Sequence, residues 1–242
     1  MVDGVTPLPP PPGQDRASRE QLYGWVYENN QWGRSPEGEK YYSDSPTAST
    51  YPYRQYVASF IRERPEIRRV VDLACGDHKV AAETDLGDTH YVGVDIYDRL
   101  IEHNRRHYGG ERREFLVRDM VEDELPPGDL CLISMALYLM SFEHVQAVLP
   151  KLRRYRYVLI TDGQPDLPAQ ERRNLDKPTG KYTPRDLFGN GFYLELEPFG
   201  LHLDVVLEYP LQNGELMRTV LLEHPEARPG GRSQERPPVT RD

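Results

Sequence analysis

Five short apolar segments alternate with helical segments between residues 69 and 161, and this alternation constrains the fold more than any other feature. The apolar segments, each typical of a β-strand, cover residues 69–73, 90–96, 114–118, 129–135 and 157–161. Helices are predicted between them at residues 79–85, 98–108 and 141–152. Strands that alternate with helices predict a parallel sheet with helices packed on its faces.

The alternation ends after Asp162, where a long polar segment runs to Pro198. Two further strand-like segments follow at residues 202–209 and 217–223, with an Asn-Gly pair at residues 213–214 between them. An Asn-Gly pair between two strands is typical of an antiparallel hairpin. The predicted fold class is therefore α/β, with a mostly parallel sheet and a C-terminal antiparallel hairpin.

The two ends of the chain differ in composition from its centre. Residues 1–20 are rich in proline and poor in large apolar groups, and residues 225–242 share this composition. Such segments cannot bury enough apolar surface to offset the entropy of ordering, so we expect two disordered tails. The intervening chain divides into a tyrosine- and tryptophan-rich segment at residues 21–66, predicted to form a helical cap, and a core domain at residues 67–224.

Charge and composition exclude several functions. The formal net charge is −9 at neutral pH, which disfavours binding to a nucleic-acid backbone. No apolar segment approaches the length of about 20 residues that a membrane-spanning helix requires. The chain has 2 cysteines, which do not form a disulfide framework and suit a reducing, cytoplasmic compartment. The acidic composition and the tyrosine-rich segment suggest a small-molecule acceptor as the partner, either cationic or sugar-like. The sequence leaves the oligomeric state open, with a homodimer as one option.

The stretch VVDLACGDH at residues 70–78 joins the first predicted strand to the first predicted helix. In a parallel sheet, ligands bind in the crevice beyond the carboxyl ends of the strands. Asp72 ends the first strand, Asp95 ends the second and lies 23 residues later, and Asp119 follows the third. An acid at the second position accepts hydrogen bonds from both hydroxyls of a ribose. Each of these residues could instead cap the helix or turn that follows it.

The composition of this loop favours one kind of cofactor. A dinucleotide loop contains three glycines, so that backbone amides can approach a pyrophosphate. The stretch ACGDH has one glycine, Gly76, and places the acidic Asp77 where phosphates would lie. A carboxylate repels phosphate and attracts the sulfonium and ammonium groups of S-adenosylmethionine (SAM). The loop therefore favours SAM over NAD.

Four segments in order, VVDLACGDH, YVGVDIYDRLIEHN, FLVRDM and LCLISMALYLMSFEHVQAVL, resemble the successive motifs of class I SAM-dependent methyltransferases. The resemblance covers residues 67 to 224. The last of these segments, and the stretch from NNQWG to YPYRQYVASFI at residues 29–61, resemble small bacterial methyltransferases of natural-product type. The resemblance implies a doubly wound, Rossmann-like sheet of seven strands with an N-terminal helical cap. It also implies methyl transfer to a nitrogen, oxygen or carbon atom of a small molecule, in bacterial secondary metabolism such as antibiotic biosynthesis.

The resemblance assigns roles to individual residues. Around the methionine part of SAM it places Asp72, Ala74, Cys75, Gly76 and Met135. Around the ribose and adenine it places Asp95, Ile96, Asp119 and Met120. As in the family, the aromatic segment that contains Trp32 would close over cofactor and acceptor as a lid. Apart from the resemblance, Arg54 could pair with the SAM carboxylate, with an ordinary surface arginine as the alternative.

The chain departs from the family pattern at three positions. Ala74 and His78 replace glycines, which predicts an ordinary backbone conformation at both residues and a His78 ring that points outward. Relatives often carry a histidine where this chain has Leu139. Without that base, the candidate catalytic residues are Tyr138 and Asp162, unless the acceptor is an amine that needs no base. Asp162 precedes a glycine, and a turn is the competing explanation for it.

Two other functions remain open from the sequence. One is a non-catalytic, methyltransferase-like binding or scaffold subunit, which the loop substitutions and the missing histidine allow. The other is an NAD-linked oxidoreductase on a related sheet, which the single loop glycine disfavours. No metal site is predicted, because His103 and His107 lie four residues apart without a third ligand.

Overall fold

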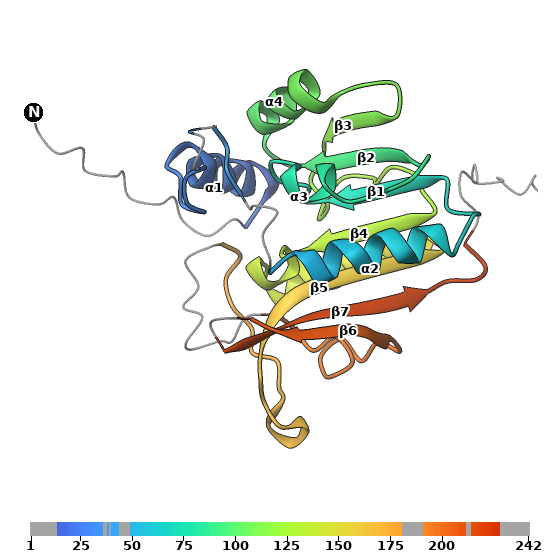
Figure 1. The fold of residues 1–242 in the computed structure, drawn as a ribbon. Helices are drawn as coiled ribbons and strands as arrows, with labels where there is room; N and C mark the ends of the chain where they lie inside the picture. Colours follow the sequence, from blue (N-terminus) through green and yellow to red (C-terminus); the bar gives the residue numbers. More distant parts are fainter. Residues whose placement is uncertain are drawn as a thin grey trace, which may run out of the picture.

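The computed structural model describes residues 14–35, 38, 40–43, 49–180, 191–211 and 214–227, and it contains one seven-stranded sheet. The strands lie in the order β3-β2-β1-β4-β5-β7-β6 (Figure 1). Their bounds are β1 Arg69–Leu73, β2 His90–Asp95, β3 Arg113–Val117, β4 Leu130–Ser134, β5 Tyr157–Pro165, β6 Asp204–Pro210 and β7 Glu215–Glu223. Strands β1 to β5 are parallel, and β7 is antiparallel to both β5 and β6. This confirms the predicted fold class, including the C-terminal hairpin.

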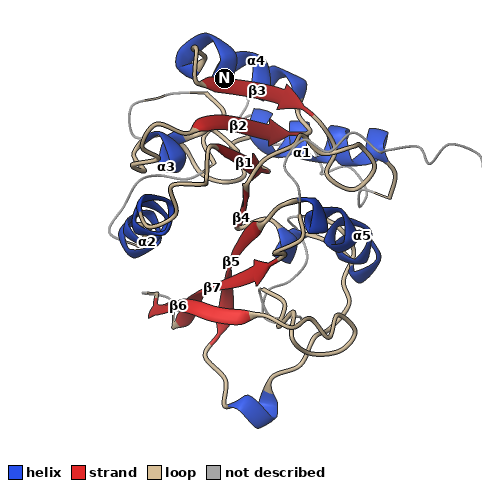
Figure 2. Cartoon of the chain, turned by 90° about the vertical axis from the view of Figure 1, so that its right-hand side faces the viewer, coloured by secondary structure: helices blue, strands red, loops and turns tan. Residues whose placement is uncertain are grey.

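Helices cover both faces of the sheet. Their bounds are α1 Arg16–Glu28, α2 Tyr51–Arg62, α3 Lys79–Ala82, α4 Asp98–Tyr108 and α5 Phe142–Val148, with short 3₁₀ helices η1 Leu137–Leu139, η2 Leu149–Arg154 and η3 Ala169–Glu171. Figure 2 shows α2 and α3 on one face and α5 on the other. Helix α1 lies beyond the carboxyl ends of the parallel strands (Figure 1).

The hydrophobic core has one cluster on each face of the sheet. Val57 and Phe60 of α2 pack with Val70 and Leu132 on one face. On the other face, Val145 and Val148 of α5 pack in a cluster that includes Val71, Cys131 and Val158. Alternate residues of β1 and β4 point to opposite faces, so both faces of these central strands are buried. Each fully buried valine or leucine contributes about 1.5–3 kcal/mol, which fixes the strand register beneath the site.

Several predicted boundaries were wrong. Residue 20 does not end a tail, because α1 begins at Arg16, with Asp15 as its N-cap. The rest of the predicted tails, residues 1–13 and 228–242, lies outside the described residues. The cap predicted at residues 21–66 divides into α1, at the strand ends, and α2, which packs on the sheet as part of the core. Strand β5 continues through Asp162 to Pro165, so the Asp-Gly pair forms no turn there. The helix predicted at residues 141–152 is α-helical only to Val148, and the chain then continues as the 3₁₀ helix η2.

Candidate active site

A cavity of about 370 Å³ opens at the carboxyl ends of the parallel strands. It brings together the predicted residues Trp32, Asp72, Ala74, Cys75, Gly76, Asp95, Ile96, Asp119, Met120, Met135 and Tyr138. Arg54 and Asp162 are the two predicted site residues that do not line it. The cavity therefore contains the loops after β1, β2, β3 and β4, as a parallel sheet requires of a ligand site.

The loop after β1 has a left-handed backbone at three positions. The φ angles are +58° at Ala74, +55° at Gly76 and +65° at His78. The prediction of ordinary conformations at Ala74 and His78 was therefore wrong. Non-glycine residues carry a strain of about 1–2 kcal/mol in this region, so the surrounding packing must hold the loop in place. The Gly76 amide points at Asp95 Oδ2 at 3.3 Å, and a side chain at Gly76 would collide with the Ser43 hydroxyl.

His78 is buried, with only 1% of its surface exposed, so the prediction of an outward ring was also wrong. Its ring packs against Tyr91, Tyr108 and Phe115, with centroids 4.7, 4.9 and 5.0 Å away. Neither ring nitrogen has a hydrogen-bond partner among the described residues. Burial, with a smaller contribution from the Arg113 cation, lowers the His78 pKa to about 3. The residue thus acts as a neutral, aromatic packing group behind the loop.

Two buried carboxylates on the cavity wall have no basic partner among the described residues. Burial raises the pKa of Asp72 to about 7, although the Tyr91 hydroxyl donates a hydrogen bond to it at 2.7 Å. Burial also raises the pKa of Asp95 to about 6, against hydrogen bonds from nearby backbone amides. A buried carboxylate without a counter-ion is costly, and a cationic ligand would relieve that cost. The site therefore fits a positively charged group.

Asp119 makes a contact that sequence reasoning missed. Its Oδ2 forms an ion pair with Arg19 of α1 at 2.5 Å, and both side chains are almost fully buried. Its Oδ1 accepts the Val121 amide at 2.9 Å. Arg19 also donates to Glu122 and lies 3.1 Å from His144 Nε2. The Arg19–Asp119 pair holds α1 over the strand ends. The predicted helical cap began only at residue 21, and the capping pair of Asp15 and Ser18 was the overlooked sequence signal for the start of this helix just before Arg19.

Met135 and Tyr138 reach the cavity on a loop that Asp162 supports. Met135 has a φ angle of +53°, and its amide donates to the Thr161 carbonyl at 2.8 Å. Asp162 accepts hydrogen bonds from the amides of Ala136 and Tyr138. Burial raises the Asp162 pKa to about 7, and the Lys177 cation and these amides oppose the shift. Asp162 thus positions the loop from behind the cavity wall.

Aromatic residues of α1 and the segment after it close one side of the cavity. Tyr23, Tyr27 and Trp32 line it, and the Tyr27 ring stacks on Tyr97 at 6.0 Å. Arg54 lies apart from them, on α2, where its guanidinium pairs with Glu83 at 3.0 Å. Tyr97, which follows β2, thus supports the aromatic wall through its contact with Tyr27.

The opposite end of the cavity is lined by residues that the sequence did not single out as site residues. They include Tyr53 of α2, Ser134 of β4, Thr161 of β5, Tyr209 of β6 and Met217 of β7. Their scattered positions explain why no motif marked them.

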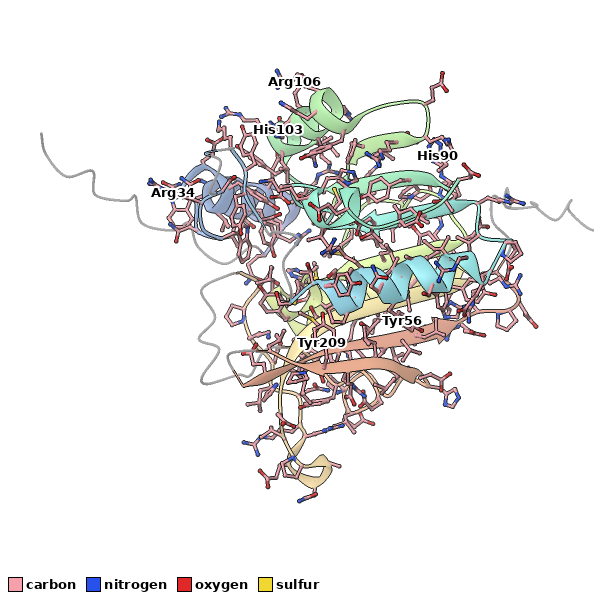
Figure 3. All side chains as sticks on the ribbon, in the orientation of Figure 1. Arg34, Tyr56, His90, His103, Arg106 and Tyr209 are labelled. Carbon is pink, nitrogen blue, oxygen red and sulfur yellow. The ribbon has the colours of Figure 1, made fainter. Side chains whose placement is uncertain are left out.

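No group of three or more histidine, cysteine or acidic residues suited to a metal ion occurs in the described part of the chain. His103 and His107 of α4 stack on each other at 4.0 Å, and His103 also contacts Tyr41. Figure 3 labels His103 near the outer end of the sheet. Across the same described residues, no helix is long and apolar enough to cross a membrane.

The chain is similar in structure to several solved methyltransferases. It matches the N-methyltransferase NodS from Bradyrhizobium japonicum WM9, bound to S-adenosylhomocysteine (SAH), with a TM-score of 0.54 and 11% identity over 76% of this chain and 90% of that one. It matches magnesium protoporphyrin IX methyltransferase (ChlM) from Synechocystis PCC 6803 with SAH, with a TM-score of 0.55 and 10% identity over 86% and 100%. It also matches the N-terminal domain of EvdMO1, determined in the presence of SAH and D-fucose. That match has a TM-score of 0.51 and 14% identity, over 91% of this chain and 99% of that one.

The chain has the class I SAM-dependent methyltransferase fold. This confirms the fold that the sequence resemblance implied. No protein-family model matches the sequence, and no curated protein matches it either. The fold thus rests on the structure, while the cofactor and reaction rest on the chemistry of the site.

Proposed function

We propose that this protein binds SAM and transfers its methyl group to a small molecule. The observation that carries this proposal is the pair of buried carboxylates, Asp72 and Asp95, which line the cavity without a basic partner among the described residues. A phosphate-bearing cofactor such as NAD would place more negative charge against them. SAM instead brings a sulfonium and an ammonium group, and the same fold holds SAH in several solved proteins.

The residues of the cavity divide among the parts of SAM. Asp72 and the loop residues Ala74, Cys75 and Gly76 would surround the methionine part, together with Met135. Asp95 would accept the ribose hydroxyls, and Ile96 and Met120 would pack on the adenine. Asp119 already pairs with the Arg19 guanidinium and accepts a hydrogen bond from the Val121 amide. We therefore assign it to holding α1 and the loop that borders the adenine site. Trp32 would cover the cofactor from the aromatic wall.

SAM supplies a methyl group on a positively charged sulfur, which a nitrogen, oxygen or carbon nucleophile takes by in-line displacement. The protein's contribution would be positioning and exclusion of water. Tyr138 lines the cavity and is the proposed contact to the acceptor. Asp162 lies behind the wall, so we assign it a positioning role through the amides of Ala136 and Tyr138. Arg54 pairs with Glu83 outside the cavity, so we no longer assign it to the SAM carboxylate.

A small-molecule acceptor fits a cavity of about 370 Å³ and the acidic chain better than a nucleic acid does. The setting in bacterial secondary metabolism is a proposal from the sequence resemblance, and the cytoplasmic location is a proposal from the two cysteines.

Isothermal titration with SAM, SAH and NAD tests the proposal. We expect SAM and SAH to bind and NAD to show no binding up to millimolar concentration. Gly76→Ala should weaken SAH binding by about tenfold, because its methyl group would collide with Ser43 in a loop that contacts the ligand. Gly87→Ala is the matched control, since Gly87 has a similar φ of +58° but no atom near its added methyl group.

Binding of NAD with no binding of SAM would overturn the proposal. Tight binding of SAH without methyl transfer to any acceptor would instead support the non-catalytic alternative.

A further inference from the structure

The cavity extends from the cofactor loop to a region beneath α2, which we call the hydroxyl end. It is defined by the side chains of Tyr53, Ser134, Thr161 and Tyr209, all of which line the cavity. They come from α2, β4, β5 and β6, and Figure 3 labels Tyr209 in the region between β6 and α2. Four segments far apart in the sequence therefore place hydroxyl groups on one part of the wall.

Tyr53 and Thr161 of this set are buried, and Ser134 and Tyr209 are half-buried. The Tyr53 phenol shares a hydrogen bond with Ser134, and Thr161 Oγ1 lies 2.9 Å from Thr219 Oγ1. Burial raises the pKa of Tyr53, and the Asp72 carboxylate and the Tyr209 phenol add to this shift. The Tyr53 and Tyr209 hydroxyls thus lie near each other and near the end of β1.

The rest of this end is apolar. Val57 of α2 is fully buried, and Met217 of β7 is 8% exposed. Both line the cavity beside the hydroxyl groups. A ligand here would therefore meet a compact apolar surface with hydroxyl groups along one edge.

The charges near this end disfavour an anion. Asp72 lies on the cavity wall beside it, and a ligand carboxylate or phosphate would be repelled when Asp72 is ionised. The Lys79 ammonium is 3.3 Å from Ser35 Oγ and 5.4 Å from the centre of the Tyr42 ring, so it interacts with the N-terminal segment. The Arg54 guanidinium, on the same helix as Tyr53, pairs with Glu83.

We propose that the hydroxyl end binds the methyl acceptor, and that the acceptor is a neutral, hydroxyl-bearing molecule with a compact apolar frame. Hydroxyl side chains both donate and accept hydrogen bonds, which matches the hydroxyl groups of a neutral ligand. Tyr53 and Tyr209 are then the residues that determine acceptor specificity. This inference rests on the proposed function, because it assigns the acceptor to the part of the cavity that SAM would leave open.

The test measures ligand binding by isothermal titration to the protein saturated with SAH. The probes are catechol, protocatechuate, which adds a carboxylate to the same ring, and methyl β-D-glucopyranoside, which carries hydroxyl groups on an aliphatic ring. We expect catechol or the glucoside to bind, and protocatechuate to bind at least about tenfold more weakly than catechol because of Asp72. Comparison of the two neutral probes shows whether the frame is aromatic or aliphatic.

Three variants locate the binding site. Tyr53→Phe and Tyr209→Phe remove only a hydroxyl group, so each should weaken binding of the neutral probe about fivefold and leave SAH affinity within about twofold. Tyr56→Phe is the matched control: Tyr56 lies on α2, does not line the cavity and packs against Phe60 at 6.0 Å. This control should bind both ligands as the wild type does.

Two failures can be told apart. If SAH does not bind, the proposed function fails, whatever the probes do. If SAH binds but neither neutral probe does, if protocatechuate binds as well as catechol, or if Tyr53→Phe and Tyr209→Phe behave as Tyr56→Phe does, this inference is overturned and the proposed function stands.

Discussion

The two ends of the cavity differ in the charge of their buried polar groups. At the end near β1 and β2, Asp72 and Asp95 are buried without a basic partner among the described residues, and burial raises the pKa of both. At the end beneath α2, Tyr53 and Thr161 are equally buried, but their neutral hydroxyl groups share hydrogen bonds with their neighbours. Buried carboxylates reduce stability unless a ligand compensates, whereas satisfied hydroxyl groups do not. We therefore propose that the end near β1 and β2, which we call the carboxylate end, binds a cation, and that the hydroxyl end binds a neutral molecule.

The largest effect should come from Asp95→Asn, which removes one carboxylate charge near β2 and leaves the hydroxyl end unchanged. Two hydrogen bonds from ribose hydroxyls to a charged carboxylate would be weakened, each worth about 1.5–3 kcal/mol, so we expect SAH affinity to fall about 100-fold. Isothermal titration measures this. Asp98→Asn, three residues further on and exposed, is the control and should bind as the wild type does. Equal affinity for SAH in both variants would show that Asp95 does not bind the ribose.

The pH dependence of SAM binding distinguishes the two ends without mutation. The pKa of Asp72 is raised to about 7 and that of Asp95 to about 6, and a cation binds their ionised forms. Affinity for SAM should therefore fall about tenfold as the pH is lowered from about 7.5 to 5.5, through these two pKa values. SAH lacks the sulfonium charge and should show a shallower dependence. Identical pH profiles for SAM and SAH would contradict a carboxylate end tuned to the sulfonium.

Asp162 belongs to neither end of the cavity, because it is a buried acid that lies behind the cavity wall. Asp162→Asn keeps an oxygen acceptor for the amides of Ala136 and Tyr138 and should lower methyl transfer less than about fivefold. Asp162→Ala removes that acceptor, so it should weaken SAH binding by about five- to tenfold through the Met135 loop. The two variants are compared by SAH titration and by turnover. A large loss of turnover in Asp162→Asn, with SAH affinity unchanged, would instead make Asp162 a catalytic base.

The smallest effect concerns His78, an ionisable group near the carboxylate end that we do not expect to contact the cofactor. His78→Phe removes two buried nitrogens that lack partners among the described residues and should stabilise the fold by about 1 kcal/mol at neutral pH. The folded-state pKa is lowered to about 3, so the wild type loses stability as the pH falls below about 6.5, where the unfolded histidine takes up a proton. The advantage of the variant should therefore grow between pH 6.5 and 4, as measured by urea unfolding.

SAH affinity should be unchanged in His78→Phe. His107→Phe, at an exposed position on α4, is the control and should alter stability by less than about 0.5 kcal/mol. A loss of SAH binding in His78→Phe would place His78 in the cofactor site.

The strands could be predicted from the sequence because burial on both faces leaves a local signal. Arg69–Leu73 was predicted with both of its ends correct, and the acids at or just after the carboxyl ends of β1, β2 and β3 were located from those strands. The conformations of Ala74 and His78 could not be predicted in this way. A left-handed backbone at a non-glycine residue is imposed by distant packing, here by Tyr91, Tyr108 and Phe115 around the His78 ring.

Long-range pairs also left no local signal. Arg19 was assigned to a tail by composition, but it pairs with Asp119, 100 residues away in the sequence. Tyr209 lies on a strand with a weak alternating pattern, and only the order of β6 and β7 in the sheet brings it near Tyr53. Both ends of the cavity therefore depend on topology, and only the carboxylate end coincides with a recognisable motif.

A crystal structure of the protein with SAH tests the central claim most directly. We predict that the ribose hydroxyls bind Asp95, that the homocysteine part lies against Ala74, Gly76 and Met135, and that the space beyond the sulfur opens toward Tyr53 and Tyr209. SAH bound elsewhere, or with its sulfur turned away from the hydroxyl end, would contradict the account.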